Sequence, residues 1–361
     1  MRATVTEFQF LKVHLFRSGE ANRPVEDETT VGKRITDYYL RLFPAFDNTS
    51  NMLQPESNVI TACRGGVLAI GNFDGVHRGH QHMAGILVSQ AQTLGVPSVA
   101  MTFDPPPAAL LRPDRVPPCL TTPRQRAELL SSYGVDQVII WPTSRELLQL
   151  GPAEFFNEII VGRLGVKGMV EGPNFCFGKN RAGDVNTLKQ FCESADIALQ
   201  IVVPVEAGEQ LVSSSRIRKL VANGEVARAI ELLGHAYQIR GEVVTGAGRG
   251  RTIGFPTANI SSIPTLVPGN GVYAGFCELD GREYDCAVNV GQNPTFGEDR
   301  AKVEVHVIGW DSDLYGLQLA VNLLSEIRPV QQFESVEQLT AQIKRDIESA
   351  KHLCAQNRAR Q

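Results

Sequence analysis

Short apolar runs alternate with segments of helical spacing from Val67 onward, and this alternation restricts the fold more than any other feature of the sequence. The run Val67-Leu68-Ala69-Ile70, which ends at Gly71, is typical of a buried strand. The same pattern predicts strands over residues 67–70, 96–103, 137–141, 168–171 and 199–203, separated by helices over 80–94, 124–133, 153–163 and 187–194. Such alternation indicates a parallel α/β sheet, whose ligands bind at the carboxyl ends of its strands.

The pattern changes after Ser213. Two short helices are expected over 215–223 and 226–233, and beyond Gly234 short strands are separated by Gly and Pro. These strands are expected over 238–244, 272–279, 282–290, 302–308 and 317–327, with a terminal helix over 336–354. Many short strands in series indicate a small β-barrel or sandwich. We therefore expect an α/β domain over 64–212, a helical linker over 213–234 and a β domain over 235–352.

Residues 1–63 differ from the rest of the chain, because they lack a repeated period and polar residues interrupt their apolar runs. We expect them to form an N-terminal extension. Two interpretations stay open: a loosely ordered arm, or translation that begins at or near Met52.

The bulk properties of the 361-residue chain argue against several classes of protein. Its net charge of −4 gives no basic field to attract nucleic acid. No stretch approaches eighteen apolar residues, so no membrane span is expected. The seven cysteines are odd in number and include no Cys-x-x-Cys pair. This argues against a disulfide framework or a zinc ribbon, and favours a reducing cytoplasm.

The segment Gly71–His80 carries the first chemical motif, and it joins a predicted strand to a predicted helix. Its glycines let the backbone approach a phosphate, and the helix N-terminus favours anions. His77 and His80 could donate hydrogen bonds to a phosphoryl transition state. The alternative is a surface loop with incidental histidines. The strand before, the helix after and Gly79 between the histidines favour phosphate binding.

The segment Gly246–Asn259 carries the second motif, which is dense in glycine and arginine. Such a loop suits polyphosphate, and the Thr257 hydroxyl is a hard oxygen ligand suited to Mg²⁺. A flexible surface hairpin is the alternative. Further along, Glu304 is a carboxylate on a predicted strand. Held rigidly there, it could accept the proton of a substrate hydroxyl. Its alternation with valines fits a solvated strand charge equally well. His306 shares the face of Glu304, and we interpret it as structural.

The segment 70–81 resembles the HxGH motif of nucleotidyltransferases, in the form found in the bacterial bifunctional riboflavin kinase/FAD synthetase family. Other stretches resemble the same family: 174–179 with 183–184, 213–218, 254–259, 289–291 with 294–296, 303–306, and 313–316 followed by Arg328 and Phe333. The resemblance covers about residues 65–352. It implies an α/β, Rossmann-like adenylyltransferase domain followed by a small β-barrel riboflavin kinase domain with a C-terminal helix.

The resemblance also implies an activity. Riboflavin would be phosphorylated to FMN, and FMN adenylylated to FAD with release of pyrophosphate, with ATP as co-substrate and Mg²⁺ in both steps. In the first domain, His77 and His80 would stabilise the ATP phosphates. Nucleotide or flavin would contact Gly71, Phe73, Asp74, Gly75, Asn174, Ser214, Ser215 and Arg218. In the second domain, Glu304 would be the base and Thr257 the metal ligand. The other binding residues would be Gly246, Arg249, Gly254, Pro256, Asn259, Asn289 and Arg328.

One position departs from the family. The family commonly has His between two prolines after the second strand, and Pro106 stands there in this sequence. Three hypotheses are consistent with this sequence. The chain is a two-step synthase, a kinase with a weak first domain that accumulates FMN, or an inactive flavin-binding regulator or carrier. The presence of Glu304, Thr257 and the two histidines argues against the last.

Overall fold

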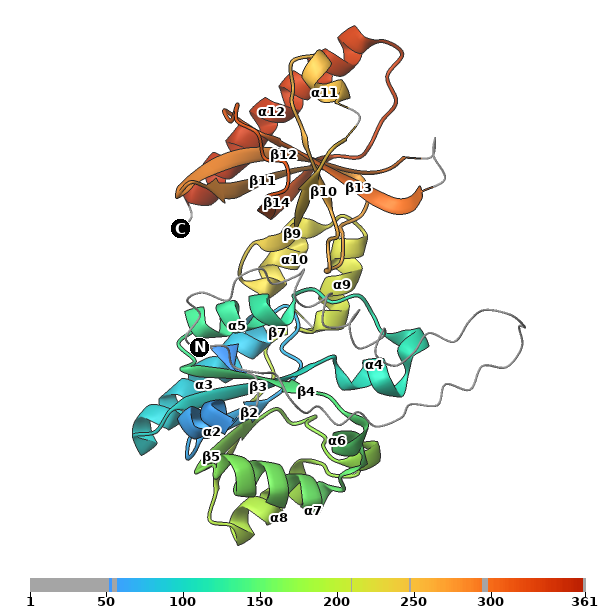
Figure 1. Cartoon of the computed structure of the whole chain (residues 1–361). Helices are drawn as coiled ribbons and strands as arrows, with labels where there is room; N and C mark the ends of the chain where they lie inside the picture. The colour runs from blue at the N-terminus through green and yellow to red at the C-terminus, as the bar shows by residue number, and fades with distance from the viewer. Residues whose placement is uncertain (1–51, 54–56, 209, 247, 294–297, 360–361) are drawn as a thin grey trace, which may run out of the picture. The chain divides into compact units, whose positions relative to one another are not determined.

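The structure is a computed structural model that describes residues 52–53, 57–208, 210–246, 248–293 and 298–359 (Figure 1). The side chains at 52–53, 57–59, 249, 292–293 and 298–301 are also outside the description. Of the expected N-terminal extension, residues 1–51 therefore lie outside the described residues.

A six-stranded parallel sheet forms the first domain. Its strand order is β1-β4-β3-β2-β5-β6, and every neighbouring pair is parallel. The strands are β1 (Met52–Leu53), β2 (Val67–Ile70), β3 (Ser98–Asp104), β4 (Gln137–Pro142), β5 (Gly168–Glu171) and β6 (Ala198–Ile201). The chain builds outward from β2 through β3 to β4, then returns to β5 on the other side of β2. The crevice for ligands in such a sheet is expected where this order reverses, between β2 and β5.

Helices cover both faces of this sheet (Figure 1). The strand β2 shows why, because its residues alternate between two apolar clusters. Val67 and Ala69 pack in the cluster of α3 and α5, whereas Leu68 and Ile70 pack in the cluster of the opposite face. The first face is covered by α3 (Arg78–Leu94) and α5 (Pro123–Ser132). The second is covered by α2 (Ser57–Cys63), α7 (Pro152–Phe155), the π-helix η2 (Phe156–Leu164) and α8 (Val185–Ser194).

Several short elements occupy the connections between these strands and helices. They are α4 (Pro107–Leu111), η1 (Pro113–Arg115), α6 (Arg145–Gln149), η3 (Lys179–Arg181) and the hairpin strands β7 (Glu206–Ala207) and β8 (Gln210–Leu211). Pro106 precedes the first turn of α4, directly after β3. It therefore lies at the carboxyl edge of the sheet, the edge at which ligands bind.

The second domain is a closed antiparallel barrel with strand order β10-β13-β12-β11-β14-β9. Its strands are β9 (Tyr237–Val244), β10 (Ala258–Ser261), β11 (Gly271–Leu279), β12 (Arg282–Asn293), β13 (Glu298–Val307) and β14 (Gln318–Arg328). Alternate residues of β13, at Val303, Val305 and Val307, are buried in the barrel core. The residues between them therefore face outward.

Four helices accompany the barrel. The long helix α12 (Val336–Arg358) packs against β11, β12 and β14 (Figure 1). The short helix α11 (Arg249–Thr252) lies within the glycine-rich segment. The helices α9 (Ser214–Ala222) and α10 (Val226–Leu233) bury Ile217, Leu220, Ala229 and Leu233 in the same apolar cluster as the barrel core. The segment that we expected to be a linker therefore contributes to a core.

The predicted fold class is confirmed, with differences in detail. The strand β10 was missed because its first two residues, Ala258 and Asn259, belong to the segment that we interpreted as a phosphate loop. The helix expected over 153–163 changes to a π-helix at Phe156. Both β1 and α2 fall in the range assigned to the extension, yet β1 pairs with β4 and Cys63 of α2 is buried in the sheet's core.

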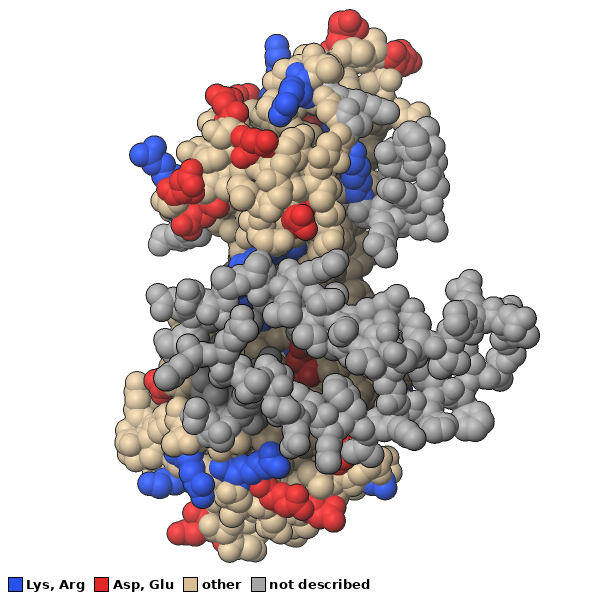
Figure 2. Space-filling model, viewed as in Figure 1, with Lys and Arg blue, Asp and Glu red and all other residues tan. Residues whose placement is uncertain are grey.

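Two surface properties bear on the sequence expectations. None of the described helices is both long enough and apolar enough to cross a membrane. On the face drawn in Figure 2, the Lys and Arg side chains stand near Asp and Glu side chains, in small groups of both signs.

Candidate active sites

The loop between β2 and α3 has an unusual backbone. Phe73 and Val76 have φ values of 46° and 36°, a region that side chains rarely occupy, and Gly75 has φ of 81°. Such conformations persist where the surroundings impose them, and they concentrate at functional sites. A Cβ at Gly79 would lie 3.2 Å from two ring atoms of His77. Glycine at this position therefore lets the His77 ring lie close to the first turn of α3.

His77 and His80 stack on each other at this helix N-terminus, with ring centroids 3.7 Å apart and an interplanar angle of 14°. His77 Nδ1 accepts a hydrogen bond from the His80 N–H at 3.4 Å, so the proton of a neutral His77 ring is on Nε2. The buried Nδ1 of His80 has no hydrogen-bond partner among the described residues. An unpaired ring nitrogen at a helix N-terminus is an arrangement that suits an anion.

Burial keeps these two rings neutral. It lowers the pKa of His77 to about 4. The pKa of His80 is lowered well below its usual value, first by burial and then by His77 and Arg126. Near neutral pH each ring is therefore uncharged and offers one N–H donor. Bringing a polyphosphate to the rings would favour their charged forms, since an opposite charge raises the pKa of a histidine.

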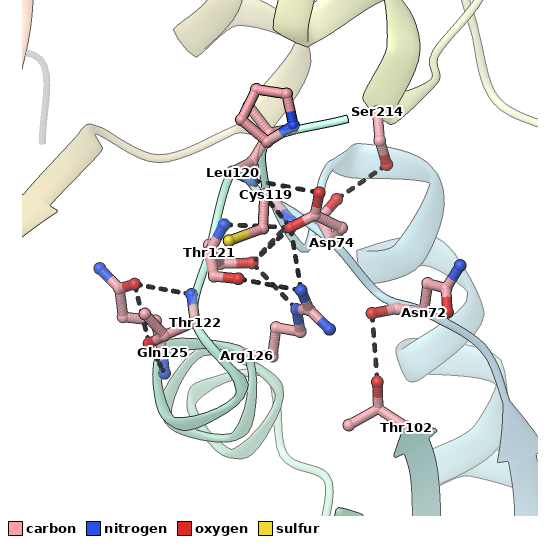
Figure 3. Close-up of polar contacts among 12 residues, drawn as sticks. Asn72, Asp74, Thr102, Cys119, Leu120, Thr121, Thr122, Gln125, Arg126 and Ser214 are labelled. Carbon is pink, nitrogen blue, oxygen red and sulfur yellow. Dashed lines mark hydrogen bonds and ion pairs between the residues drawn. The ribbon is translucent and has the colours of Figure 1, made fainter. Parts of the chain in front are cut away.

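The carboxylate of Asp74 is the centre of a buried network (Figure 3). Leu120 N–H donates to both oxygens at 3.0 and 3.1 Å, and Thr121 donates from its N–H at 3.0 Å and its hydroxyl at 3.1 Å. Arg218 Nη2 lies 2.5 Å and Arg126 Nη2 3.4 Å from a carboxylate oxygen. Asp74 is 4% exposed. Its carboxylate therefore fastens the β2–α3 loop to the segment before α5 and to α9.

The serine-rich motif joins this network in part. The Ser214 hydroxyl donates to the backbone carbonyl of Asp74 at 2.8 Å (Figure 3). Ser213 caps α9, because its hydroxyl accepts from the Arg216 N–H. Ser215 is exposed in the first turn of α9. Asn174 is exposed on the loop that follows β5, at the same edge of the sheet as the loop after β2. The structure thus joins Asp74, Ser214 and Arg218, and leaves Ser215 and Asn174 accessible.

Glu171 is a buried acid that the sequence analysis did not identify. It is the last residue of β5 and is 1% exposed, and its Oε1 accepts the Ile70 N–H at 2.8 Å. Burial raises the pKa of Glu171 well above its usual value. A charged residue at the end of the buried run Gly168–Glu171 was the available signal. Glu171 lies where β2 and β5 separate, at the reversal of strand order.

Replacing Glu171 with glutamine is expected to stabilise the protein more as the pH rises. Unfolded glutamate titrates at about 4.3, and the folded chain holds the proton to higher pH. Between these two pKa values the folded state binds more protons, so raising the pH lowers the free energy of unfolding of the wild type. Glu171→Gln removes this decrease in the free energy of unfolding, which amounts to at most about 1.4 kcal/mol per pH unit.

Denaturant unfolding of Glu171→Gln and wild type from pH 5 to 8 measures this effect, with Glu193→Gln on the exposed face of α8 as the control. A constant difference between Glu171→Gln and wild type across this range would show that Glu171 is ionised in the folded protein.

In the second domain, Glu304 lies between two asparagines from neighbouring strands. It is paired with Asn259 of β10 on one side and with Asn289 of β12 on the other. Val303 and Val305 point into the barrel, so Glu304 points outward into a cavity of about 450 Å³ under α12. This placement favours a role in a site over a solvated strand charge.

The glycine-rich segment reaches the same cavity. A Cβ at Gly246 would lie 2.1 Å from Asn259 Nδ2, so only glycine permits this close approach. The residues Gly248, Gly250 and Thr257 line the cavity with Asn259. Asn259 is 8% exposed and its Oδ1 has no partner among the described residues. The segment therefore brings a hydroxyl and a free amide oxygen to one side of the cavity.

The other residues predicted for the kinase site do not share one environment. Arg328 lines the cavity, and its guanidinium bonds Asp346 of α12 through Nε and Nη2 at 2.8–3.1 Å. Gly254 has φ of 86°, and the Pro256 carbonyl is bonded to His306 Nδ1 at 2.8 Å. His306, which we interpreted as structural, also lines the cavity. The side chain of Arg249 lies outside the description.

The donor set fits a metal that ATP brings with it better than a resident ion. No group of three or more His, Cys, Asp or Glu residues that could hold a metal occurs among the described residues. Magnesium takes oxygen ligands, usually keeps several waters, and is bound through few protein groups together with substrate phosphates. The Thr257 hydroxyl and the unpartnered Asn259 Oδ1 provide oxygens of this kind in the cavity.

Comparison with known proteins assigns both domains. A family model for FAD synthetase matches residues 60–216, and one for riboflavin kinase matches residues 233–354. A bifunctional riboflavin kinase/FMN adenylyltransferase of Pseudomonas fluorescens is 36% identical over 293 residues, which are 81% of this chain and 94% of that protein. The protein of the same description from Bacillus subtilis is 34% identical, over 79% of this chain and 91% of the relative.

A solved structure agrees with the fold. A crystal structure described as a macrolide-efflux protein from Streptococcus pneumoniae superposes with a TM-score of 0.75 at 32% identity, and covers 83% of this chain and 98% of that one.

The HxGH loop on a parallel sheet, followed by a barrel with an acid between two asparagines, defines a two-domain enzyme that transfers phosphoryl and nucleotidyl groups. With both family models matched in this order, the chain belongs to the bifunctional riboflavin kinase/FAD synthetase family. Riboflavin, FMN, FAD and ATP are the substrates and products of the reactions of this family.

Proposed function

We propose that the two reactions of this riboflavin kinase and FMN adenylyltransferase each use the site described above in its domain. The observation that supports this best is the position of Glu304, an acid held on a rigid strand between Asn259 and Asn289 and facing a cavity. Riboflavin and ATP would bind in this cavity. The FMN formed there would be adenylylated in the α/β domain.

In the kinase step, Glu304 accepts the proton of the 5′-hydroxyl of the ribityl chain. A base in this role must lie within about 2.6–3.2 Å of the hydroxyl oxygen. As the proton leaves, the oxygen bonds to the γ-phosphorus of ATP, the bond from this phosphorus to the β–γ bridging oxygen breaks, and ADP departs. Gly248, Gly250 and Thr257 of the glycine-rich segment line the cavity and would lie beside the phosphates.

Thr257 and Asn259 would hold the divalent ion that accompanies ATP. Mg²⁺, when bound, would offset the negative charge of the phosphates. Arg328 is fixed by Asp346 and by its position over the Phe333 ring, 5.7 Å from the ring centroid. It can therefore present a flat, ordered wall of the cavity to the flavin.

In the adenylylation step, the phosphate of FMN attacks the α-phosphorus of ATP and pyrophosphate leaves. This phosphate is already ionised near neutral pH, so the protein does not need to supply a base. The neutral rings of His77 and His80 donate N–H groups to the phosphate oxygens, on which negative charge develops. Ser215 and Asn174 are exposed and could contact nucleotide or flavin, whereas Asp74 and Arg218 would act by holding the loop.

Replacing His77 and His80 with alanine tests the assignment of the first site. We expect adenylylation of supplied FMN to fall by about 10²–10³-fold for each ring removed, the range measured for single donors of this kind. Phosphorylation of riboflavin by the same variants should remain within about twofold of wild type, because neither ring lies in the kinase cavity. The replacement His82→Ala, on an exposed position of α3, is the matched control. Adenylylation at the wild-type rate by both His77→Ala and His80→Ala would disprove the assignment.

A cytoplasmic location is part of the proposal. All seven cysteines are free, and the buried Cys286 Sγ donates a hydrogen bond to Cys277 Sγ at 3.5 Å with no disulfide between them. Free thiols at this distance support a reducing compartment.

A further inference from the structure

A lysine lies beside the acid of the kinase cavity. Lys302 is two residues before Glu304 on β13, so both side chains leave the same face of the strand. Lys302 Nζ lies 2.6 Å from Glu304 Oε1, and both side chains are only about one third exposed. Both residues line the cavity.

The surroundings leave this ammonium group available to a ligand. Lys302 is paired across the ladder with Gly291 of β12, and a Cβ at Gly291 would meet no atom of the described residues within 4 Å. Open space in the cavity therefore borders the lysine. Two of the described lining residues are lysine or arginine, namely Lys302 and Arg328. The guanidinium of Arg328 is hydrogen-bonded to Asp346. Among the described lining residues, Lys302 is therefore the lysine or arginine that lies next to Glu304, whereas the charge of Arg328 is paired with Asp346.

The geometry of the reaction restricts what this ammonium can contact. The base must be about 2.6–3.2 Å from the attacking hydroxyl oxygen, and that oxygen about 3–3.5 Å from the γ-phosphorus. A cation in contact with the base is then within reach of the oxygens of the transferred phosphoryl group. These oxygens carry the charge of the transition state, and positively charged side chains commonly stabilise it.

We propose that Lys302 is a catalytic residue of the kinase step, in which its ammonium bridges the Glu304 carboxylate and the γ-phosphoryl group of ATP. The proposal rests on the proposed function of Glu304 as the base. Glu304 takes the hydroxyl proton, the oxygen–phosphorus bond forms as the bond to ADP breaks, and Lys302 keeps its own proton throughout. Without ATP, the lysine neutralises the acid; with ATP, it binds the phosphoryl oxygens as well.

Steady-state kinetics of Lys302→Met and Lys302→Arg test this proposal. For Lys302→Met we expect the kcat of riboflavin phosphorylation to fall by about 10²–10³-fold, with the KM for riboflavin within about threefold of wild type. Lys302→Arg keeps the charge, and its kcat for riboflavin phosphorylation should lie within about tenfold of the wild-type value. Adenylylation of supplied FMN reports that the chain is folded, and it should be unchanged in both variants.

The matched control is Lys351→Met on α12. It breaks an exposed Lys–Glu pair of similar length, 2.7 Å from Lys351 Nζ to Glu348 Oε1, and should leave both activities unchanged. A kcat of Lys302→Met within threefold of wild type, while Glu304→Gln is inactive as a kinase, would overturn the role of Lys302 alone. Equal losses in Lys302→Met and Lys302→Arg with a raised KM for riboflavin would also overturn it, since they indicate a structural role. Full kinase activity of Glu304→Gln would instead overturn the proposed function.

Discussion

Replacing Glu304 with glutamine is expected to slow the phosphorylation of riboflavin by about 10²–10⁴-fold, the usual contribution of a general base. Glutamine keeps the size of the side chain and the pairing of β13 with the flanking strands, but it loses the charge that pairs with Lys302 and cannot take the hydroxyl proton. The loss should appear in kcat, because the proton is transferred in the transition state and not on binding. The KM for riboflavin should change little.

The measurement is the rate of FMN formation from riboflavin and ATP, with FAD formation from supplied FMN followed on the same preparation. Glu278→Gln, an exposed acid of β11 outside the cavity, is the matched control. The base would have to be sought elsewhere if Glu304→Gln phosphorylated riboflavin within about threefold of the wild-type rate. A loss of both activities would indicate misfolding, and Glu304→Asp would then be needed to separate chemistry from structure.

Replacing Asp74 with alanine is expected to destabilise the protein by about 3–5 kcal/mol, because the change leaves buried charge without its partner. Arg126 is 2% exposed and Arg218 has only 19% of its side chain exposed, so neither can be solvated fully. The N–H groups of Leu120 and Thr121 also lose their acceptor. The loop that carries His77 should shift, and adenylylation should fall more than phosphorylation.

The shift of the thermal unfolding midpoint measures this effect, and roughly 10 °C is expected for a loss of this size. Asp74→Asn keeps an oxygen for the backbone donors and should lose less. Glu225→Ala removes the partner of Arg228 in an exposed pair and should cost below about 1 kcal/mol. A midpoint for Asp74→Ala equal to that of Glu225→Ala would mean that the buried network does not stabilise the fold.

The elements with strong periodicity could be predicted from the sequence. The strand β2 is four buried residues in a row, and α3 ends where Gly95 adopts a left-handed conformation, as the glycine suggested. Five of the six described barrel strands were also predicted, because glycine and proline separate them. The strand β10 was missed since its four residues come after a glycine-rich loop and resemble part of it. The residue pattern within such a short segment does not reveal which strands it pairs with.

The candidate sites could be predicted as sets of residues, but their contacts could not. Asp74 was assigned to ligand binding, whereas its carboxylate is occupied by residues 46 to 144 positions away in sequence. No local spacing encodes such long-range pairs. The burial of Glu171 likewise depends on β2 and β5 lying side by side.

The pair of Lys302 and Glu304 was within reach of sequence reasoning, since residues two apart on a strand share a face.

Conversion of riboflavin to FAD by the purified wild-type chain, with ATP and Mg²⁺ and separation of the flavins by chromatography, tests the central claim most directly. Two working sites in one chain predict that FMN appears first and that FAD then accumulates as the final product. Accumulation of FMN without FAD, even when FMN is supplied at high concentration, would contradict the claim of two activities and would direct attention to Pro106.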